Sequence, residues 1–351
     1  MIRAGRERER GGAAGRGWVK RPGGWTTLSR VILRTVNNSY GRRRLGTALV
    51  GAAVALTLAA CSGGSSGAAG TTAATSGSAG AAGGAVQVVA ATNVWGDVVK
   101  QIGGDHVEVT SIITDPSADP HSFQSSPRNQ LALSKAQLIV ENGGGYDDFM
   151  QTMVSSAGTS APVVVAVDAS GVTAQDGELN EHVWYDLPGT IKVADAIAAQ
   201  LASIDPANAV TYQANSAAFD QAVSDLVTQA QAIKARHDGA PVAITEPVTV
   251  YLLETAGLTN VTPAEFSDAI ENETDVPAAI MNETLALFAD KQVTLLAYNE
   301  QTTGPQTEQV LEAAKSNGIP TVPVTETLPD GQDYLSWMTS KIQALSQALG
   351  G

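Results

Sequence analysis

One long predicted helix constrains the fold of this chain more than any other feature of its sequence. Residues 205–236 contain no glycine, and their one proline, Pro206, stands at the second position. Asp205 is a favourable N-cap residue, and proline is well tolerated in a first helical turn. Apolar side chains such as Tyr212 and Phe219 recur at helical spacing. We therefore expect one helix of about 45 Å, long enough to connect two domains.

Short apolar strands alternate with helices on both sides of this helix. The expected strands are 86–91, 107–113, 137–140 and 162–167 before it, and 241–245, 293–298 and 321–324 after it. The expected helices between them are 93–102, 127–135, 187–203, 247–256, 276–289, 305–316 and 332–349. Such alternation predicts mostly parallel sheets covered by helices on both faces.

The length and this pattern together predict an α/β protein of two lobes. A chain of 351 residues is long enough for two domains. We expect an N-terminal α/β lobe over 86–204, a linking long helix over 205–238 and a C-terminal α/β lobe over 239–351. Both lobes would have mostly parallel sheets, and ligands of such sheets bind beyond the carboxyl ends of the strands.

The first sixty residues have the composition of an export signal. Residues 1–60 hold 12 of the 21 basic residues and only two acidic ones, and residues 45–60 are apolar and uncharged. That stretch is shorter than the roughly 20 residues of a membrane span. The sequence LAAC at 58–61 resembles a bacterial lipobox. We expect lipidation at Cys61 and anchoring at the extracytoplasmic face of the cell membrane; the alternative is an uncleaved signal anchor.

Two segments flank this signal. Residues 1–35 exceed what an export signal needs, and a start of translation nearer Val36 would account for them. After Cys61 comes a tract of Gly, Ala, Ser and Thr that extends to residue 85 and has no large apolar side chain. Because it cannot form a core, we expect residues 61–85 to act as a flexible linker.

Charge and cysteine content exclude several kinds of protein. The formal net charge is −14, and removal of residues 1–60 would leave 9 basic and 33 acidic residues, a net charge of −24. Such an acidic body does not suit a nucleic-acid-binding protein, which needs a basic surface. The single cysteine excludes a disulfide framework and a multi-cysteine zinc or iron–sulfur site.

Four residues of metal-ligand type follow predicted strands, two in each lobe. His121 and His182 follow the strands 107–113 and 162–167 through loops, and Glu246 and Glu326 follow the strands 241–245 and 321–324 almost directly. Two imidazoles and two carboxylates neutralise a divalent cation and suit Zn²⁺ or Mn²⁺. Each of the four has a simpler interpretation. The two histidines could be surface residues, Glu246 could stand at a helix N-terminus, and Glu326 could be a solvated loop acid.

At these residues the chain resembles the extracytoplasmic metal-binding proteins of ABC importers for zinc and manganese, the ZnuA-like cluster A-I family. The resemblance covers roughly residues 86–349. It is carried by DPH at 119–121, EHVWYDL at 181–187, DPAN at 205–208, TEPVTVYLLETAGL at 245–258 and VTETLPDGQDYLSWM at 324–338. The family fold has two α/β lobes bridged by one long helix, with the metal site in the cleft between the lobes.

The resemblance implies a function and a ligand set. His121, His182, Glu246 and Glu326 would hold one divalent transition metal ion, Mn or Zn, as the transported ligand. Glu300 aligns with a family glutamate and would lie behind the ligands or serve as an alternative ligand. The protein would pass its metal to an ABC permease and its ATPase, would be a monomer held to the membrane by its lipid anchor, and would not be an enzyme.

Two departures from the family pattern bear on the metal. The third ligand is Glu246, where zinc importers often have histidine, and the fourth is Glu326, where the family usually has aspartate. The sequence also lacks the His-rich acidic loop of many zinc members. These features favour Mn²⁺, although most nitrogen and oxygen sites bind Zn²⁺ more tightly.

Two other functions fit parts of the sequence. A secreted metallohydrolase could use the same four groups, with Glu300 as a general base, but no HExxH segment is present, and the GxSxG match at residues 63–67 lies in the tract expected to be a linker. A surface adhesin would explain the linker and the anchor but none of the four ligands.

Overall fold

A computed structural model describes residues 84–115, 123, 125–174 and 178–351. The predicted export signal, the lipidation site Cys61, nearly all of the linker and the predicted ligand His121 lie outside these residues. Within the described part, no helix combines the length and the apolar character needed to cross a membrane.

Two parallel sheets have the same strand order. The first contains β1 (Val86–Thr92), β2 (Val107–Ile113), β3 (Leu138–Glu141) and β4 (Val163–Val165), in the order β2-β1-β3-β4. The second contains β5 (Pro241–Ile244), β6 (Thr259–Asn260), β7 (Leu296–Asn299) and β8 (Thr321–Val324), in the order β6-β5-β7-β8. Every pairing is parallel, as between Val88 and both Val109 and Leu138. The predicted α/β class is confirmed.

Helices connect the strands and cover the sheets. In the N-terminal half they are α1 (Asn93–Gly103), α2 (Pro127–Lys135), α3 (Asp148–Ala157), α4 (Ala166–Ser170) and α5 (Leu187–Ile204). The C-terminal half contains α7 (Val250–Thr255), α8 (Ala264–Glu271), α9 (Ala278–Ala289), α10 (Pro305–Ser316) and α11 (Tyr334–Ala348). Short 3₁₀ turns lie at η1 (Gly104–His106), η3 (Val183–Tyr185), η4 (Pro206–Asn208) and η5 (Pro247–Thr249).

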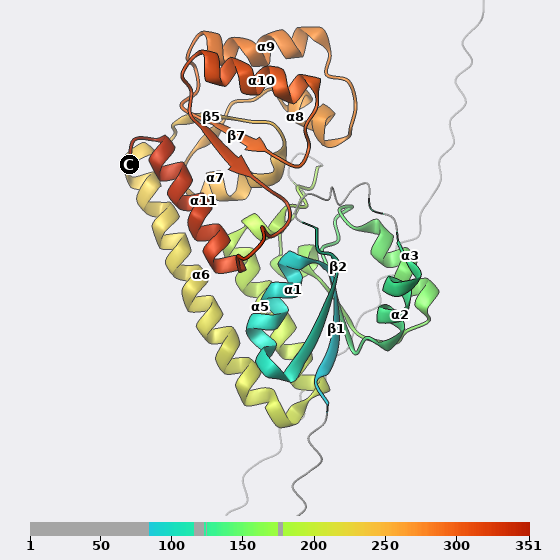
Figure 1. Ribbon diagram of the computed structural model, residues 1–351. Helices are drawn as coiled ribbons and strands as arrows, with labels where there is room; N and C mark the ends of the chain where they lie inside the picture. Colours follow the sequence, from blue (N-terminus) through green and yellow to red (C-terminus); the bar gives the residue numbers. More distant parts are fainter. Residues whose placement is uncertain (1–83, 116–122, 124, 175–177) are drawn as a thin grey trace, which may run out of the picture. The chain divides into compact units, whose positions relative to one another are not determined.

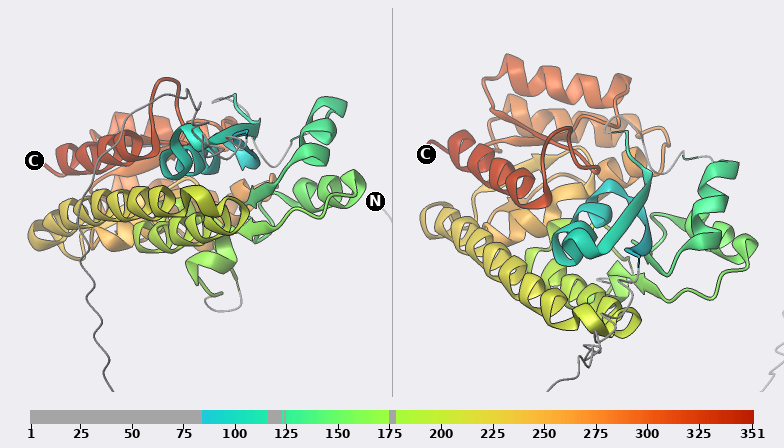
Figure 2. Two further views of the ribbon diagram at one scale, coloured as in Figure 1. Left: turned by 90° about the horizontal axis from the view of Figure 1, so that it is seen from below. Right: turned by 60° about the horizontal axis from the view of Figure 1, so that its bottom comes forward.

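The predicted long helix is present as α6, Ala209–His237. It begins four residues later than Asp205 because the turn η4 precedes it. The Asp205 carboxylate does not cap the backbone; it accepts hydrogen bonds from Asn208 Nδ2 at 2.6 Å and from Tyr212 Oη at 2.8 Å. Helix α6 contacts α1 and α5 from the first half and α7 and α11 from the second (Figure 1). Figure 2 shows α6 alongside α5 from two further sides.

The two lobes share one hydrophobic core. Val88 of the first sheet, Ile244 of the second, Phe219 of α6 and Tyr334 and Trp337 of α11 belong to the same buried cluster. The rings of Phe219 and Tyr334 lie 5.8 Å apart, and those of Tyr334 and Trp337 6.4 Å apart. A wide opening of the lobes would expose this apolar surface to water, so the core favours small relative movements.

Candidate metal centre

Two predicted ligands of the C-terminal lobe meet at the carboxyl ends of its strands. Glu246 comes two residues after β5, Glu326 two residues after β8, and Asn299 ends β7 between them. The Asn299 side chain is fully buried, and its Nδ2 donates to Glu246 Oε2 at 2.6 Å and to Glu326 Oε1 at 2.8 Å. One amide therefore holds both carboxylates in place, as parallel strands that end at one edge of a sheet allow.

Both carboxylates are withdrawn from solvent. Glu246 is 4% exposed and Glu326 2%. Buried carboxylates are costly unless hydrogen bonds or a cation compensate for their lost hydration. Gln301 holds the segment that carries Glu326. Its Oε1 accepts a hydrogen bond from the backbone N–H of Glu326, and its Nε2 donates to Thr327 Oγ1 at 2.9 Å.

Glu300 lies between Asn299 and Gln301 in the sequence, but its side chain is not buried with them. Its side chain is exposed, and its backbone N–H donates to Val324 O at 3.1 Å. Burial lowers the pKa of Lys341, and the charge of Glu300 offsets part of that shift. The hydrogen bonds to both carboxylates come from Asn299, and the role of Glu300 behind the ligands or as an alternative ligand stays a prediction.

His182 reaches the site from the N-terminal lobe. It directly precedes η3 and is fully buried. Its Nδ1 lies 2.8 Å from Asn180 Oδ1, and the same oxygen accepts the backbone N–H of His182 at 3.1 Å. Asn180 Nδ2 donates to Pro247 O at 3.0 Å, which fixes the orientation of the amide. Nδ1 therefore carries the proton, and Nε2 presents its lone pair, the arrangement of a metal-binding imidazole.

Asn180 also ties the two lobes together beside the site. Its side chain donates to the carbonyl of Pro247, which directly follows Glu246. Its own carbonyl accepts a hydrogen bond from Tyr251 Oη at 2.7 Å. The loop that carries His182 is thus fastened to the segment that carries Glu246.

An aromatic wall encloses the imidazole. The His182 ring centroid lies 6.0 Å from that of Tyr146 and 5.2 Å from that of Trp184. Burial raises the pKa of the Tyr146 hydroxyl well above its usual range, and the nearby charges of Glu326, then Asp147 and Glu271, add to that shift. Tyr146 therefore stays neutral and lies beside both His182 and Glu326.

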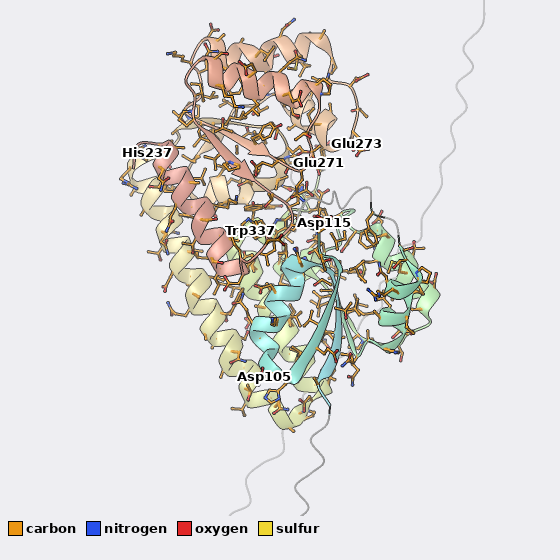
Figure 3. The ribbon with its side chains drawn as sticks, in the orientation of Figure 1. Asp105, Asp115, His237, Glu271, Glu273 and Trp337 are labelled. Atoms are coloured by element: carbon orange, nitrogen blue, oxygen red, sulfur yellow. The ribbon has the colours of Figure 1, made fainter. Side chains whose placement is uncertain are left out.

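Glu271 is a member of this site that the sequence did not indicate. It ends α8, and its Oε1 lies 3.6 Å from His182 Nε2. Ligand atoms of Glu181, His182 and Glu271 lie within 4.8 Å of one another. Figure 3 shows Glu271 at the end of α8, with Glu273 beyond it. Tyr146 lies between this group and Glu326, and we call Glu181, His182 and Glu271, together with Glu246 and Glu326, the cleft cluster.

The chemistry of the cleft cluster suits a divalent cation. It combines one imidazole nitrogen with four carboxylates and contains no thiolate. Nitrogen and oxygen donors of this kind bind Zn²⁺ and Mn²⁺, and a cation would compensate the buried negative charge. The remaining predicted ligand, His121, lies outside the described residues, so its position in the site remains a prediction.

Among proteins of known function, the chain is similar to manganese-binding lipoproteins. It is 27% identical over 217 residues to the manganese-binding lipoprotein MntA of Halalkalibacterium halodurans, covering 57% of this chain and 72% of the relative. It is 29% identical over 157 residues to the manganese ABC transporter substrate-binding lipoprotein PsaA of Streptococcus pneumoniae, covering 42% of this chain and 50% of the relative. The chain thus spans about half the length of several curated relatives that it matches.

Solved structures and a family model agree on the fold. A crystal structure of ZnuA matches with a TM-score of 0.64 at 19% identity, over 75% of this chain and 98% of that one. The solute-binding protein FpvC of Pseudomonas aeruginosa, solved with Mn²⁺, matches with a TM-score of 0.64 at 20% identity. The match covers 76% of this chain and 98% of FpvC. The family model of the zinc-uptake complex component A, periplasmic (ZnuA), matches residues 88–348. The chain belongs to this ZnuA family.

Proposed function

We propose that this chain is the solute-binding component of an ABC importer and captures one divalent transition metal ion between its lobes. The observation that carries the proposal is the pair of buried carboxylates Glu246 and Glu326, which Asn299 joins, with Tyr146 beside both Glu326 and the buried His182. Family membership supports it, since the matched relatives are named as manganese-binding or metal-transport lipoproteins.

The proposed ligand set is His121, His182, Glu246 and Glu326, with Mn²⁺ or Zn²⁺ as the cargo. The carboxylate-rich C-terminal half of this set favours Mn²⁺, which prefers more oxygen donors than Zn²⁺. The names of MntA, PsaA and the Mn²⁺ complex of FpvC support the same choice. Tight but reversible binding would follow from a preformed site whose lobes move only slightly, because the shared core limits their opening.

The proposed partners are an ABC permease and its ATPase, and no bond of the cargo is made or broken. Lipidation at Cys61 and the linker 61–85 would keep the binding lobes near the permease outside the cytoplasmic membrane. The net charge of −24 after removal of residues 1–60 would raise the local concentration of cations around the protein.

Metal analysis of the purified protein tests this function. We expect one metal ion per chain, with saturable binding and without hydrolysis of ester, peptide or phosphate substrates. The double variant His121→Ala, Glu246→Ala should lose tight binding while its circular dichroism spectrum stays unchanged. Competition between Mn²⁺ and Zn²⁺ on the metal-free chain then identifies the preferred cargo.

A matched control variant removes one histidine and one glutamate that lie outside the proposed site. His237 ends α6, and Glu308 is exposed on α10. The double variant His237→Ala, Glu308→Ala should keep full metal content. Unchanged metal content in the His121→Ala, Glu246→Ala variant would contradict the proposed ligand set, and turnover of a substrate would favour a metallohydrolase.

A further inference from the structure

Asn299 stands at the point of the C-terminal sheet where two buried glutamates meet. It ends β7, which lies between β5 and β8, and Glu246 and Glu326 each follow one of these flanking strands by two residues. Its backbone N–H donates to Thr245 Oγ1 at 2.9 Å, directly before Glu246 in the chain. The central strand of the three therefore fixes the Asn299 side chain between the two carboxylates.

The orientation of the Asn299 amide follows from the partner of its oxygen. Oδ1 accepts the backbone N–H of Gln301 at 3.1 Å, so the NH₂ group faces the other way. There Nδ2 donates to Glu246 Oε2 at 2.6 Å and to Glu326 Oε1 at 2.8 Å, and Thr302 Oγ1 accepts a longer contact at 3.2 Å. An amide nitrogen carries two hydrogens, so one is available for each carboxylate.

These hydrogen bonds engage one oxygen of each carboxylate. A carboxylate can bind a cation through one oxygen or through both, and the second mode gives the ion twice as many donor atoms. An oxygen that already accepts a short hydrogen bond is a poorer donor to a cation, so each glutamate favours coordination through its other oxygen. With Asn299 in place, Glu246 and Glu326 therefore supply one donor atom each, and without it they could supply two each.

The number of donor atoms separates the two candidate cargoes. Zn²⁺ is satisfied by four ligands in a tetrahedron, whereas Mn²⁺ prefers an octahedron of oxygen donors. The carboxylate content of the site favours Mn²⁺, and each carboxylate oxygen that is withheld from the ion reduces this advantage. A residue that sets the binding mode of two carboxylates thus acts on the metal preference.

We propose that Asn299 is a positioning residue that restricts Glu246 and Glu326 to one donor oxygen each and thereby moves the preference of the site from Mn²⁺ toward Zn²⁺. This inference rests on the proposed function. Asn299 does not itself bind the ion, because its Oδ1 is turned to Gln301 and its Nδ2 carries hydrogens instead of a free lone pair. The carboxylates attract the cation, and the amide determines how many oxygens they offer.

Two variants with fewer donor hydrogens test this role on the metal-free full-length chain. Asn299→Ser keeps one hydroxyl hydrogen, enough for one carboxylate, and Asn299→Leu is of similar size and keeps none. Dissociation constants for Mn²⁺ and Zn²⁺ are measured by competition with a chelator of known affinity. The ratio of the Mn²⁺ constant to the Zn²⁺ constant should fall roughly tenfold or more in Asn299→Leu and by a smaller factor in Asn299→Ser. A merely structural role would weaken the binding of both ions equally and leave this ratio unchanged.

Binding of Co²⁺ reports the number of donor atoms independently of affinity. The visible absorption of Co²⁺ is strong in four-coordinate sites and weak in six-coordinate ones. We expect the absorption of the Co²⁺-loaded protein to decrease from the unchanged chain to Asn299→Ser and again to Asn299→Leu.

A matched control removes an asparagine outside the site. Asn317 follows α10, where its Nδ2 donates to Ala313 O at 2.8 Å, and Asn317→Leu should change neither the ratio nor the Co²⁺ spectrum. Circular dichroism checks folding, and if Asn299→Leu does not fold, the same criteria apply to Asn299→Ser alone. If the Asn299 variants match Asn317→Leu in the ratio and the spectrum, the inference is wrong although the proposed function stands. If the unchanged chain binds neither Mn²⁺ nor Zn²⁺, the proposed function itself fails.

Discussion

Asn180 Oδ1 accepts both the backbone N–H of His182, at 3.1 Å, and a hydrogen bond from its ring Nδ1, at 2.8 Å. One amide oxygen thus sets the tautomer and the orientation of the only described histidine in the cleft cluster. The amide is itself held across the cleft by Pro247 O. Asn180 is therefore the residue through which the C-terminal lobe positions a ligand of the N-terminal lobe.

Asn180→Ala should weaken metal binding without unfolding the protein. Partners behind metal-binding histidines typically contribute 10–100-fold to affinity, so we expect a loss of about that size. The measurement is the dissociation constant for Mn²⁺ with circular dichroism as the check on folding. Asn208→Ala removes an amide at η4, far along the chain from the cluster, and should keep the affinity of the unchanged protein. Equal affinities in the two variants would show that Asn180 does not support His182.

Asn299→Asp should make folding depend on metal. The change places a third carboxylate against Glu246 and Glu326 in a buried position and removes the donor that both now share. We expect the free energy of unfolding of the metal-free protein to fall by about 2–4 kcal/mol, and bound metal to restore much of it. Urea unfolding with a chelator and with Mn²⁺ measures both values.

The control for this change is another asparagine outside the cluster. Asn317 follows α10, where its Nδ2 donates to Ala313 O. Asn317→Asp should have the same small cost with and without metal. A metal-independent cost for Asn299→Asp would mean that Glu246 and Glu326 do not meet at a cation.

The sequence predicted the fold well because its alternation and long helix are strong local signals. The helices 127–135 and 305–316 and the strands 107–113 and 321–324 agree with α2, α10, β2 and β8 to the residue. Helices α3, α4 and α8 and the short strand β6 were not predicted, and α4 begins inside the strand expected over 162–167. Strand β6 has only two residues, and α8 has eight, of which only three are buried, so neither carries enough hydrophobic periodicity to be recognised.

The missed helix explains the missed site residue. Glu271 stands at the end of α8, so no strand-end argument could bring it to the cleft. The charge of Glu300 is a stronger sequence signal than the amide of its neighbour Asn299. Asn299 ends β7, whose four residues are all buried, and there its neutral amide donates to both carboxylates.

Asp195 of α5 and Asp220 of α6 form an acidic pair that predicts a pH-dependent stability of the fold. Burial, and then the Asp195 carboxylate, raise the pKa of Asp220 to about 6. In the unfolded chain an aspartate titrates near pH 3.9. The folded protein therefore holds a proton that the unfolded chain releases between about pH 4 and pH 6, so stability falls as pH rises through this window.

Asp220→Asn should remove the fall in stability that accompanies the rise in pH from about 4 to 6. The variant should be more stable than the unchanged protein at pH 7, and the difference should shrink as pH falls toward 4. Urea midpoints measured across this range test the sign. Asp195→Asn relieves the same repulsion and keeps an oxygen for the Ser216 hydroxyl, so the double variant should gain little over either single one. Additive gains would show that the two carboxylates act independently.

Tyr334→Phe should destabilise the contact between α11 and the turn that follows His182. The Tyr334 side chain is fully buried, and its hydroxyl donates to Trp184 O at 2.6 Å. Removal of the hydroxyl leaves that carbonyl without this donor in a place closed to water, which should cost about 1–2 kcal/mol in the free energy of unfolding. Urea unfolding of the metal-free chain measures the change. Since Phe keeps the ring packed against Phe219 and Trp337, an unchanged free energy of unfolding would mean that this hydrogen bond does not help to join the two lobes.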